Sequence, residues 1–219
     1  ELLYSATEMD TRASGEKQFD YVNPRNRDVQ IEMEIAATKH LKRINAWLPE
    51  VKKEIELDEN FDVEATVVIP VKNRATTVGM AIDSALKQET SFNFNLIVVD
   101  NFSSDGTTEV LIDFSERDER VIHHIPDSTY LGIGGCWNEA VFSEYCGKFA
   151  VQLDSDDLYS SEHTLQKIID KFYEEKSAMV IGSYQMTNFA IEEIPPGIID
   201  HKEWTPDNGP NNALRINGL

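Results

Sequence analysis

The sequence predicts an α/β fold: a mainly parallel β-sheet with helices on both faces, preceded by an N-terminal helical extension. Three observations lead to this prediction. From residue 65 onward, short β-rich runs alternate with amphipathic helical stretches, which is the rhythm of β-α-β units. The β-rich runs are continuously apolar, as in Thr66-Val67-Val68-Ile69, and such runs suit strands that are covered on both faces. Residues 37–55 instead carry a single helical periodicity.

The N-terminal residues 1–60 are expected to form a polar lead-in, up to about residue 27, followed by an amphipathic helix. Beginning at Ala37, apolar side chains follow a 3-4-3-4 spacing that marks one helical face: Leu41, Ile44, Leu48, Val51 and Ile55. The helix is expected either to pack this face against the neighbouring domain, or to serve as a linker or join two copies in a homo-oligomer. Residues 61–219 are expected to form the second domain, which contains the sheet.

Five runs in this second domain have the length and composition of strands: residues 65–70, 95–100, 120–125, 149–153 and 178–182. Between them, apolar side chains recur at i, i+3 and i+4, and the clearest helical stretches are residues 76–88, 134–145 and 161–175. Right-handed crossovers place the carboxyl ends of parallel strands at one edge of the sheet, and ligands of open α/β sheets bind at that edge. The functional site is therefore expected just after the strand ends.

Composition excludes several classes of protein. The chain has 20 Lys+Arg against 39 Asp+Glu, and the resulting charge of −19 excludes a nucleic-acid binder that works by bulk positive charge. The longest uncharged apolar runs are far shorter than the roughly 20 residues that span a bilayer. The two cysteines, Cys136 and Cys146, fall in one expected helix, where about 15 Å would separate them, too far for a disulfide. A reducing, cytoplasmic compartment is therefore expected.

The ends of the first two strands carry candidate binding residues. At the first, Pro70 closes the strand, and the backbone exposed after it is open to a flat ring. An ordinary turn between strand and helix is the alternative. At the second, Asp100 directly ends an apolar strand, where its carboxylate can accept the N–H of a base or the hydroxyls of a ribose. The alternative there is that Ser103, Ser104 or Asp105 caps the next helix.

The fourth strand ends in the sharpest motif, with three carboxylates in four residues: Asp154, Asp156 and Asp157. Such carboxylates repel one another and raise one another's pKa unless a cation lies among them. Hard oxygen ligands of this kind suit Mg²⁺ or Mn²⁺ holding a diphosphate. The alternative is a solvated acidic turn that caps the helix near Ser161.

Together, these segments resemble the inverting glycosyltransferase family 2 in their order and spacing: residues 67–74, 97–107 and 154–157. The resemblance covers roughly residues 64–190 and is specific, although an isolated D-x-D would not be. It implies the Rossmann-like glycosyltransferase-A fold and a nucleotide-diphosphate sugar donor, most often UDP-linked. The implied reaction is metal-assisted transfer with inversion to an unknown carbohydrate or lipid-linked acceptor, as in polysaccharide biosynthesis.

The resemblance also implies roles for individual residues. Pro70, Val71 and Asn73 would hold the uracil and ribose, with Asp100 accepting a hydrogen bond from the base. Lys72 stands where many members of the family carry an aromatic residue, which implies weaker stacking on the uracil.

For the D-x-D pair, the resemblance implies that Asp154 lies by the ribose and sugar and that Asp156 is the principal ligand of Mn²⁺ or Mg²⁺. Asp157 would add charge at the metal or a water-mediated contact to it. Before a later helix, the family places a glycine, a basic residue and an asparagine. Asn138 matches that asparagine and is a candidate for donor binding, but Cys136 and Trp137 occupy the neighbourhood of the basic residue.

The catalytic base is missing from this pattern. In the family, a late Asp, commonly in a Glu-Asp pair, deprotonates the acceptor hydroxyl. The 219 − 157 = 62 residues after Asp157 contain no such pair. We therefore expect the base to lie beyond Leu219, and the chain to be a fragment that binds donor but transfers poorly. The membrane association of a full-length protein stays open.

Two rival functions remain at this point. The acidic strand end also resembles the D-x-D loop of haloacid-dehalogenase phosphatases, in which the first Asp is a nucleophile. Those loops usually continue with Gly-Thr, whereas Leu158 follows Asp157 here. The other rival is a donor-binding or degenerate module without catalysis, which docks through its amphipathic helix.

Overall fold

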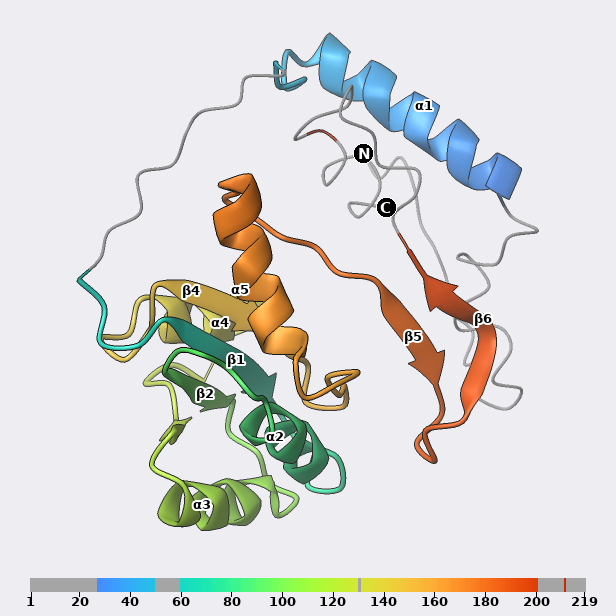
Figure 1. Cartoon of the computed structure of the whole chain (residues 1–219). Helices are drawn as coiled ribbons and strands as arrows, with labels where there is room; N and C mark the ends of the chain where they lie inside the picture. Colours follow the sequence, from blue (N-terminus) through green and yellow to red (C-terminus); the bar gives the residue numbers. More distant parts are fainter. Residues whose placement is uncertain (1–26, 50–59, 130, 201–210, 212–219) are drawn as a thin grey trace. The chain divides into compact units, whose positions relative to one another are not determined.

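The computed structural model describes residues 27–49, 60–129, 131–200 and 211 (Figure 1). The chain divides into two compact units, one comprising Glu1–Lys53 and Ile181–Leu219 and the other Glu54–Val180. The predicted lead-in lies outside the described residues. The predicted domain limits, 1–60 and 61–219, stay predictions.

The second unit is built on a parallel sheet of four strands, which correspond to the first four of the five predicted strands (Figure 1). The strands are β1 (Ala65–Val71), β2 (Phe94–Asp100), β3 (Val121–His124) and β4 (Phe149–Gln152), in the order β3-β2-β1-β4. The continuously apolar composition of β1 has the expected cause, because all seven of its residues are buried.

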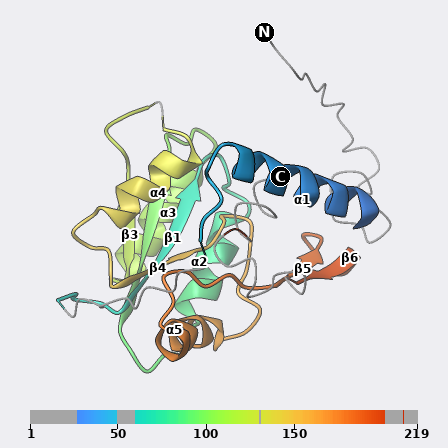
Figure 2. The same ribbon diagram turned by 90° about the horizontal axis from the view of Figure 1, so that it is seen from above.

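Helices cover both faces of this sheet, which confirms the predicted fold class. They are α2 (Val78–Leu86), α3 (Thr107–Arg117), α4 (Ile133–Val141) and α5 (Thr164–Glu175). Alternate residues of β1 point to opposite faces, so Val67 and Ile69 pack with α2, α3 and α5. Val68 instead packs with α4, which lies on the other side of the sheet (Figure 2).

The fifth predicted strand, residues 178–182, does not form. These residues have no ladder partner, and Met179 and Ile181 stay 58% and 37% exposed, because a run that joins no strand leaves its apolar side chains uncovered. The next strands belong to the first unit, where β5 (Tyr184–Thr187) pairs antiparallel with β6 (Glu193–Ile199).

The N-terminal helix begins near residue 27 as predicted, but it is shorter than predicted. It is α1 (Arg27–Arg43), and it ends before the predicted apolar positions 44 and 48. Asn45 has a φ of 57°, and its N–H donates to the carbonyl of Lys42, while the N–H of Ala46 donates to the carbonyl of Leu41. This pair of bonds around a left-handed residue is a Schellman motif, which ends a helix. Apolar spacing alone does not reveal such an end.

Two smaller findings concern α4 and the membrane. The helix ends at Val141, so the expectation that Cys136 and Cys146 share one helix was wrong. Both cysteines are free thiols. Within the residues that the structure describes, no helix has the length and apolar character needed to span a bilayer.

Candidate functional site

The carboxyl ends of β1 and β2 are joined by an interlocked pair of loops. Asn73 has a φ of 54°, a left-handed conformation that asparagine tolerates better than most residues. Its N–H donates to Ser103 Oγ at 3.0 Å, and its Oδ1 accepts from the Ser104 N–H at 2.8 Å. The N–H of Arg74 donates to Thr107 Oγ1 at 2.8 Å. Asn73 therefore supports the loop pair through its hydrogen bonds.

Asp100 lies beneath these loops and is only 1% exposed. Its carboxylate accepts from the Ser103 N–H at 3.0 Å and from Thr108 Oγ1 at 2.6 Å, and His123 Nε2 lies 3.6 Å away. Burial by itself raises the pKa of this carboxyl, but these hydrogen bonds and the nearby histidine hold the pKa below its ordinary value. The carboxylate thus accepts hydrogen bonds from residues that closely follow it in the chain, Ser103 and Thr108.

A pocket of about 380 Å³ opens where β1, β2 and β4 end. The described residues that line it come from the turn after β1, the end of β2, the start of α4 and the acidic loop after β4: Pro70, Val71, Lys72, Arg74, Asn101, Ile133, Cys136, Asp154, Ser155 and Asp156. The structure therefore brings together four of the predicted binding residues: Pro70, Val71, Asp154 and Asp156. The other four do not line the pocket: Asn73, Asp100, Asn138 and Asp157.

Asn101 is a pocket residue that the sequence analysis missed. Its N–H continues the sheet by donating to the carbonyl of Val71 at 2.9 Å, and its Nδ2 donates to the carbonyl of Leu131 at 2.7 Å. Its Oδ1 is buried and has no hydrogen-bond partner in the described part of the chain. A buried acceptor without a partner is costly, which makes this oxygen a candidate for a ligand donor. The sequence did offer one indication of this role, because Asn101 directly follows the strand-ending Asp100.

The acidic loop presents its carboxylates unequally. Asp154 Oδ1 accepts from Gln152 Nε2 at 3.0 Å, and the Asp154 carbonyl accepts from the Asp157 N–H at 3.0 Å. Asp156 Oδ2 lies 3.6 Å from Arg74 Nε. Desolvation, together with the charges of Asp154 and Asp156, raises the pKa of the Asp157 carboxyl. The charges of Asp154 and Asp156 thus act on Asp157 in the direction that the sequence predicts, and desolvation is the larger cause.

The donor set suits a hard divalent cation. Asp154 and Asp156 line one pocket and offer carboxylate oxygens, and Mg²⁺ is usually held by one or two carboxylates together with substrate phosphates. The aspartates do not form a compact cage of protein ligands. In the described residues, the group of three whose ligand atoms lie within 4.8 Å of one another is Glu89, Glu162 and His163.

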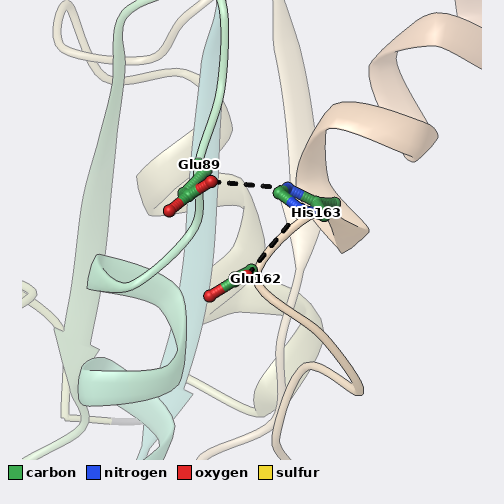
Figure 3. A group of neighbouring side chains, drawn as sticks. All are labelled: Glu89, Glu162 and His163. Carbon is green, nitrogen blue, oxygen red and sulfur yellow. Dashed lines mark ion pairs between the residues drawn. The ribbon is translucent and has the colours of Figure 1, made fainter.

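Figure 3 shows this second group, in which His163 lies between the two glutamates at 3.8 Å from each. The backbone N–H of Glu89 donates to the carbonyl of Glu162 at 2.7 Å, which joins the segment after α2 to the segment before α5. All three side chains are exposed, and none lines the 380 Å³ pocket. Exposed pairs at this distance contribute little to stability.

A larger hollow of about 870 Å³ lies at the other end of the strands, beside the first residues of β2. Its walls include Phe94, over which the guanidinium of Arg120 lies at 5.1 Å from the ring centroid. Asn95 also lines it, and its Nδ2 donates to the carbonyl of Tyr145. Because ligands of open α/β sheets bind at the carboxyl ends of the strands, the smaller pocket is the stronger candidate.

Known proteins that are similar to this chain point to one family. Residues 66–217 match the family model described as Glycosyl transferase family 2. Over 128 residues the chain is 31% identical to the Escherichia coli protein named UDP-Glc:alpha-D-GlcNAc-diphosphoundecaprenol beta-1,3-glucosyltransferase WfgD, covering 58% of this chain and 48% of that one. It is 26% identical over 127 residues to Glycosyltransferase GlyA of Streptococcus pneumoniae, covering 58% of this chain and 18% of that one.

Among solved structures, residues 1–349 of TarS from S. aureus are similar, with a TM-score of 0.47 and 22% identity over 60% of this chain and 38% of that one. The chain spans less than half the length of each of these relatives.

Proposed function

The chain belongs to glycosyltransferase family 2, and on that basis we propose that it binds a nucleotide-diphosphate sugar, with UDP as the nucleotide, in the pocket at the carboxyl ends of β1, β2 and β4. The chain has the glycosyltransferase-A fold that was expected from the sequence. The E. coli relative whose name specifies a UDP-glucose donor supports the choice of nucleotide.

One observation carries the proposal: Asp154 and Asp156 line the same pocket as basic and amide residues from two other strand ends. A nucleoside diphosphate needs this mixture, because its base and ribose offer hydrogen-bond donors and its phosphates need cations. The volume of about 380 Å³ lies within the roughly 300–1,000 Å³ of ordinary ligand pockets.

We assign roles as follows. The turn containing Pro70 and Val71 lies against the base, and the buried Oδ1 of Asn101 accepts a hydrogen bond from the nucleoside. Asp154 lies towards the ribose and sugar, and Asp156 is the principal ligand of a divalent cation, Mn²⁺ or Mg²⁺. Such an ion, when bound, offsets the charge that develops on the departing diphosphate.

Transfer with inversion requires an acceptor hydroxyl to attack the anomeric carbon from the face opposite the diphosphate. The chain's own residues would hold the donor in that orientation, which removes much of the entropic part of the barrier. Asp154 and Asp156 are the carboxylates among the described lining residues, and both are assigned to the donor. No base for the acceptor hydroxyl is assigned within the described part of the chain.

Isothermal titration of UDP with and without Mn²⁺ tests this proposal. We expect metal-dependent binding to the wild type and at least about tenfold weaker binding to Asp156→Ala, because a charge-assisted contact is worth about 1.5–3 kcal/mol. Asp113→Ala is the matched control, since Asp113 pairs with Arg117 on the exposed surface of α3. Equal binding by both variants, or no binding by the wild type, would contradict the proposal.

A second assay separates a catalyst from a donor-binding module. Slow hydrolysis of a UDP-sugar that disappears in Asp156→Ala supports catalysis. Binding without any hydrolysis supports the non-catalytic alternative.

A further inference from the structure

Two basic side chains enter the pocket from the turn after β1, where the family resemblance implied no cation. Lys72 and Arg74 both line it. On the α4 side, where the resemblance implied a basic residue, the described lining consists of Ile133 and the buried Cys136. Neither of these side chains can carry a positive charge, because isoleucine has no ionisable group and a cysteine thiol is neutral or, when ionised, negative. The positive charge of the pocket thus comes from the β1 side.

Arg74 has a fixed backbone and an adjustable side chain. Its N–H donates to Thr107 Oγ1 at 2.8 Å, and this hydrogen bond fixes the backbone of Arg74 against the loop that follows β2. Its Nη1 donates to the carbonyl of Asn73 at 3.1 Å, and its Nε lies 3.6 Å from Asp156 Oδ2. The Arg74 and Asp156 side chains are 49% and 43% exposed. An ion pair this long and this exposed is held weakly, so the guanidinium can change partners at little cost.

Resting on the proposed function, we propose that Arg74 is a donor-binding residue that exchanges partners. In the absence of ligands its guanidinium balances the charge of Asp156. When a divalent cation takes Asp156, the guanidinium turns to the diphosphate of the donor. The planar fork of arginine matches two phosphate oxygens, which makes this contact stronger than the pair it replaces.

The exchange links the metal to the nucleotide. A divalent cation that binds alone competes with Arg74 for Asp156, so its affinity is reduced. A nucleoside diphosphate gives Arg74 a new partner and removes that competition. Metal and diphosphate therefore bind more tightly together than separately, and this coupling is reciprocal by thermodynamic linkage.

Titration of three ligands measures the exchange: Mn²⁺ alone, UDP with Mn²⁺, and UMP with Mn²⁺. For Arg74→Gln we expect Mn²⁺ alone to bind about 1.5- to 5-fold tighter, because the competing cation is gone. We expect UDP with Mn²⁺ to bind roughly 10- to 100-fold weaker, because a charge-assisted phosphate contact is lost. UMP should lose less than UDP, since it lacks the second phosphate. Arg74→Lys should recover part of the loss, because it keeps the charge without the fork.

The control is Arg117→Gln, which removes an arginine paired with Asp113 on α3 and should leave all three affinities unchanged. Circular dichroism checks that each variant is folded. If the wild type binds UDP, Asp156→Ala abolishes binding and Arg74→Gln binds every ligand as the wild type does, the exchange is refuted and the proposed function stands. If the wild type does not bind UDP, the proposed function fails and this inference fails with it.

Discussion

Replacement of Asp100 with alanine is expected to destabilise the fold far more than it affects the shape of the pocket. The carboxylate is 1% exposed and accepts two hydrogen bonds, from the Ser103 N–H and from Thr108 Oγ1. Each bond to a charged acceptor is worth about 1.5–3 kcal/mol. The cost of burying the carboxylate offsets part of this sum, so we expect a net loss of about 2–4 kcal/mol.

The pH dependence of this loss has a defined sign. The pKa of Asp100 is lower in the folded chain than its ordinary value of 3.8, so the folded state binds the proton less tightly than the unfolded state. The stabilisation is therefore fully present above pH 3.8 and is lost as the pH falls through the lowered pKa. The difference in the free energy of unfolding between wild type and Asp100→Ala should shrink over the same acidic range.

Urea unfolding followed by circular dichroism measures the effect at pH 7, with Asn101→Ala as the neighbouring control. That variant loses one neutral hydrogen bond, to the Leu131 carbonyl, and should cost about 1 kcal/mol. It should weaken UDP binding, because its Oδ1 is assigned to the nucleoside. The reasoning is refuted if Asp100→Ala keeps wild-type stability but loses UDP affinity, since Asp100 would then act on the donor as the resemblance implied.

Three further predictions concern other parts of the chain. Asp157→Asn should raise the free energy of unfolding at pH 7 by less than about 1 kcal/mol, because the raised pKa of Asp157 means that its ionisation opposes folding. Urea titration should show no gain below pH 3.8, where Asp157 is protonated in both the folded and the unfolded chain. Gly147→Ala should lower the melting temperature by several degrees, because its Cβ would lie 2.7 Å from the Val63 carbonyl oxygen; an unchanged value would contradict this packing. Asn45→Ala should reduce the helix signal of α1 in circular dichroism at a cost of about 1 kcal/mol, whereas Asn45→Gly should preserve it.

The sheet was predictable because its strands bury both faces. A strand such as β1 has no polar face to maintain, so its apolar run stands out from the helices around it. The run at residues 178–182 is also uncharged and apolar but has no partner strand, and pairing depends on the whole fold rather than on the run itself. The end of α1 at Asn45 depends on one left-handed residue, which apolar spacing does not register.

The pocket at the strand ends could be expected from the sequence, whereas the residues assigned to donor binding stay predictions. The strand ends that carry Pro70 and Asp154 do meet in one pocket, because parallel strands share a carboxyl edge. Adjacent residues of a strand point to opposite sides, and a one-dimensional motif does not say which of Asp100 and Asn101 faces the pocket. The contribution of Arg74 depends on the approach of two loops, which only the three-dimensional structure provides.

Anomalous diffraction at the manganese edge, from crystals of the chain grown with UDP and Mn²⁺, tests the central claim most directly. The account predicts one manganese peak at Asp156, with the diphosphate beside it and the uridine between the β1 turn and Asn101. UDP in the 870 Å³ hollow beside Phe94, or manganese at Glu89 and His163 with none at Asp156, would contradict it.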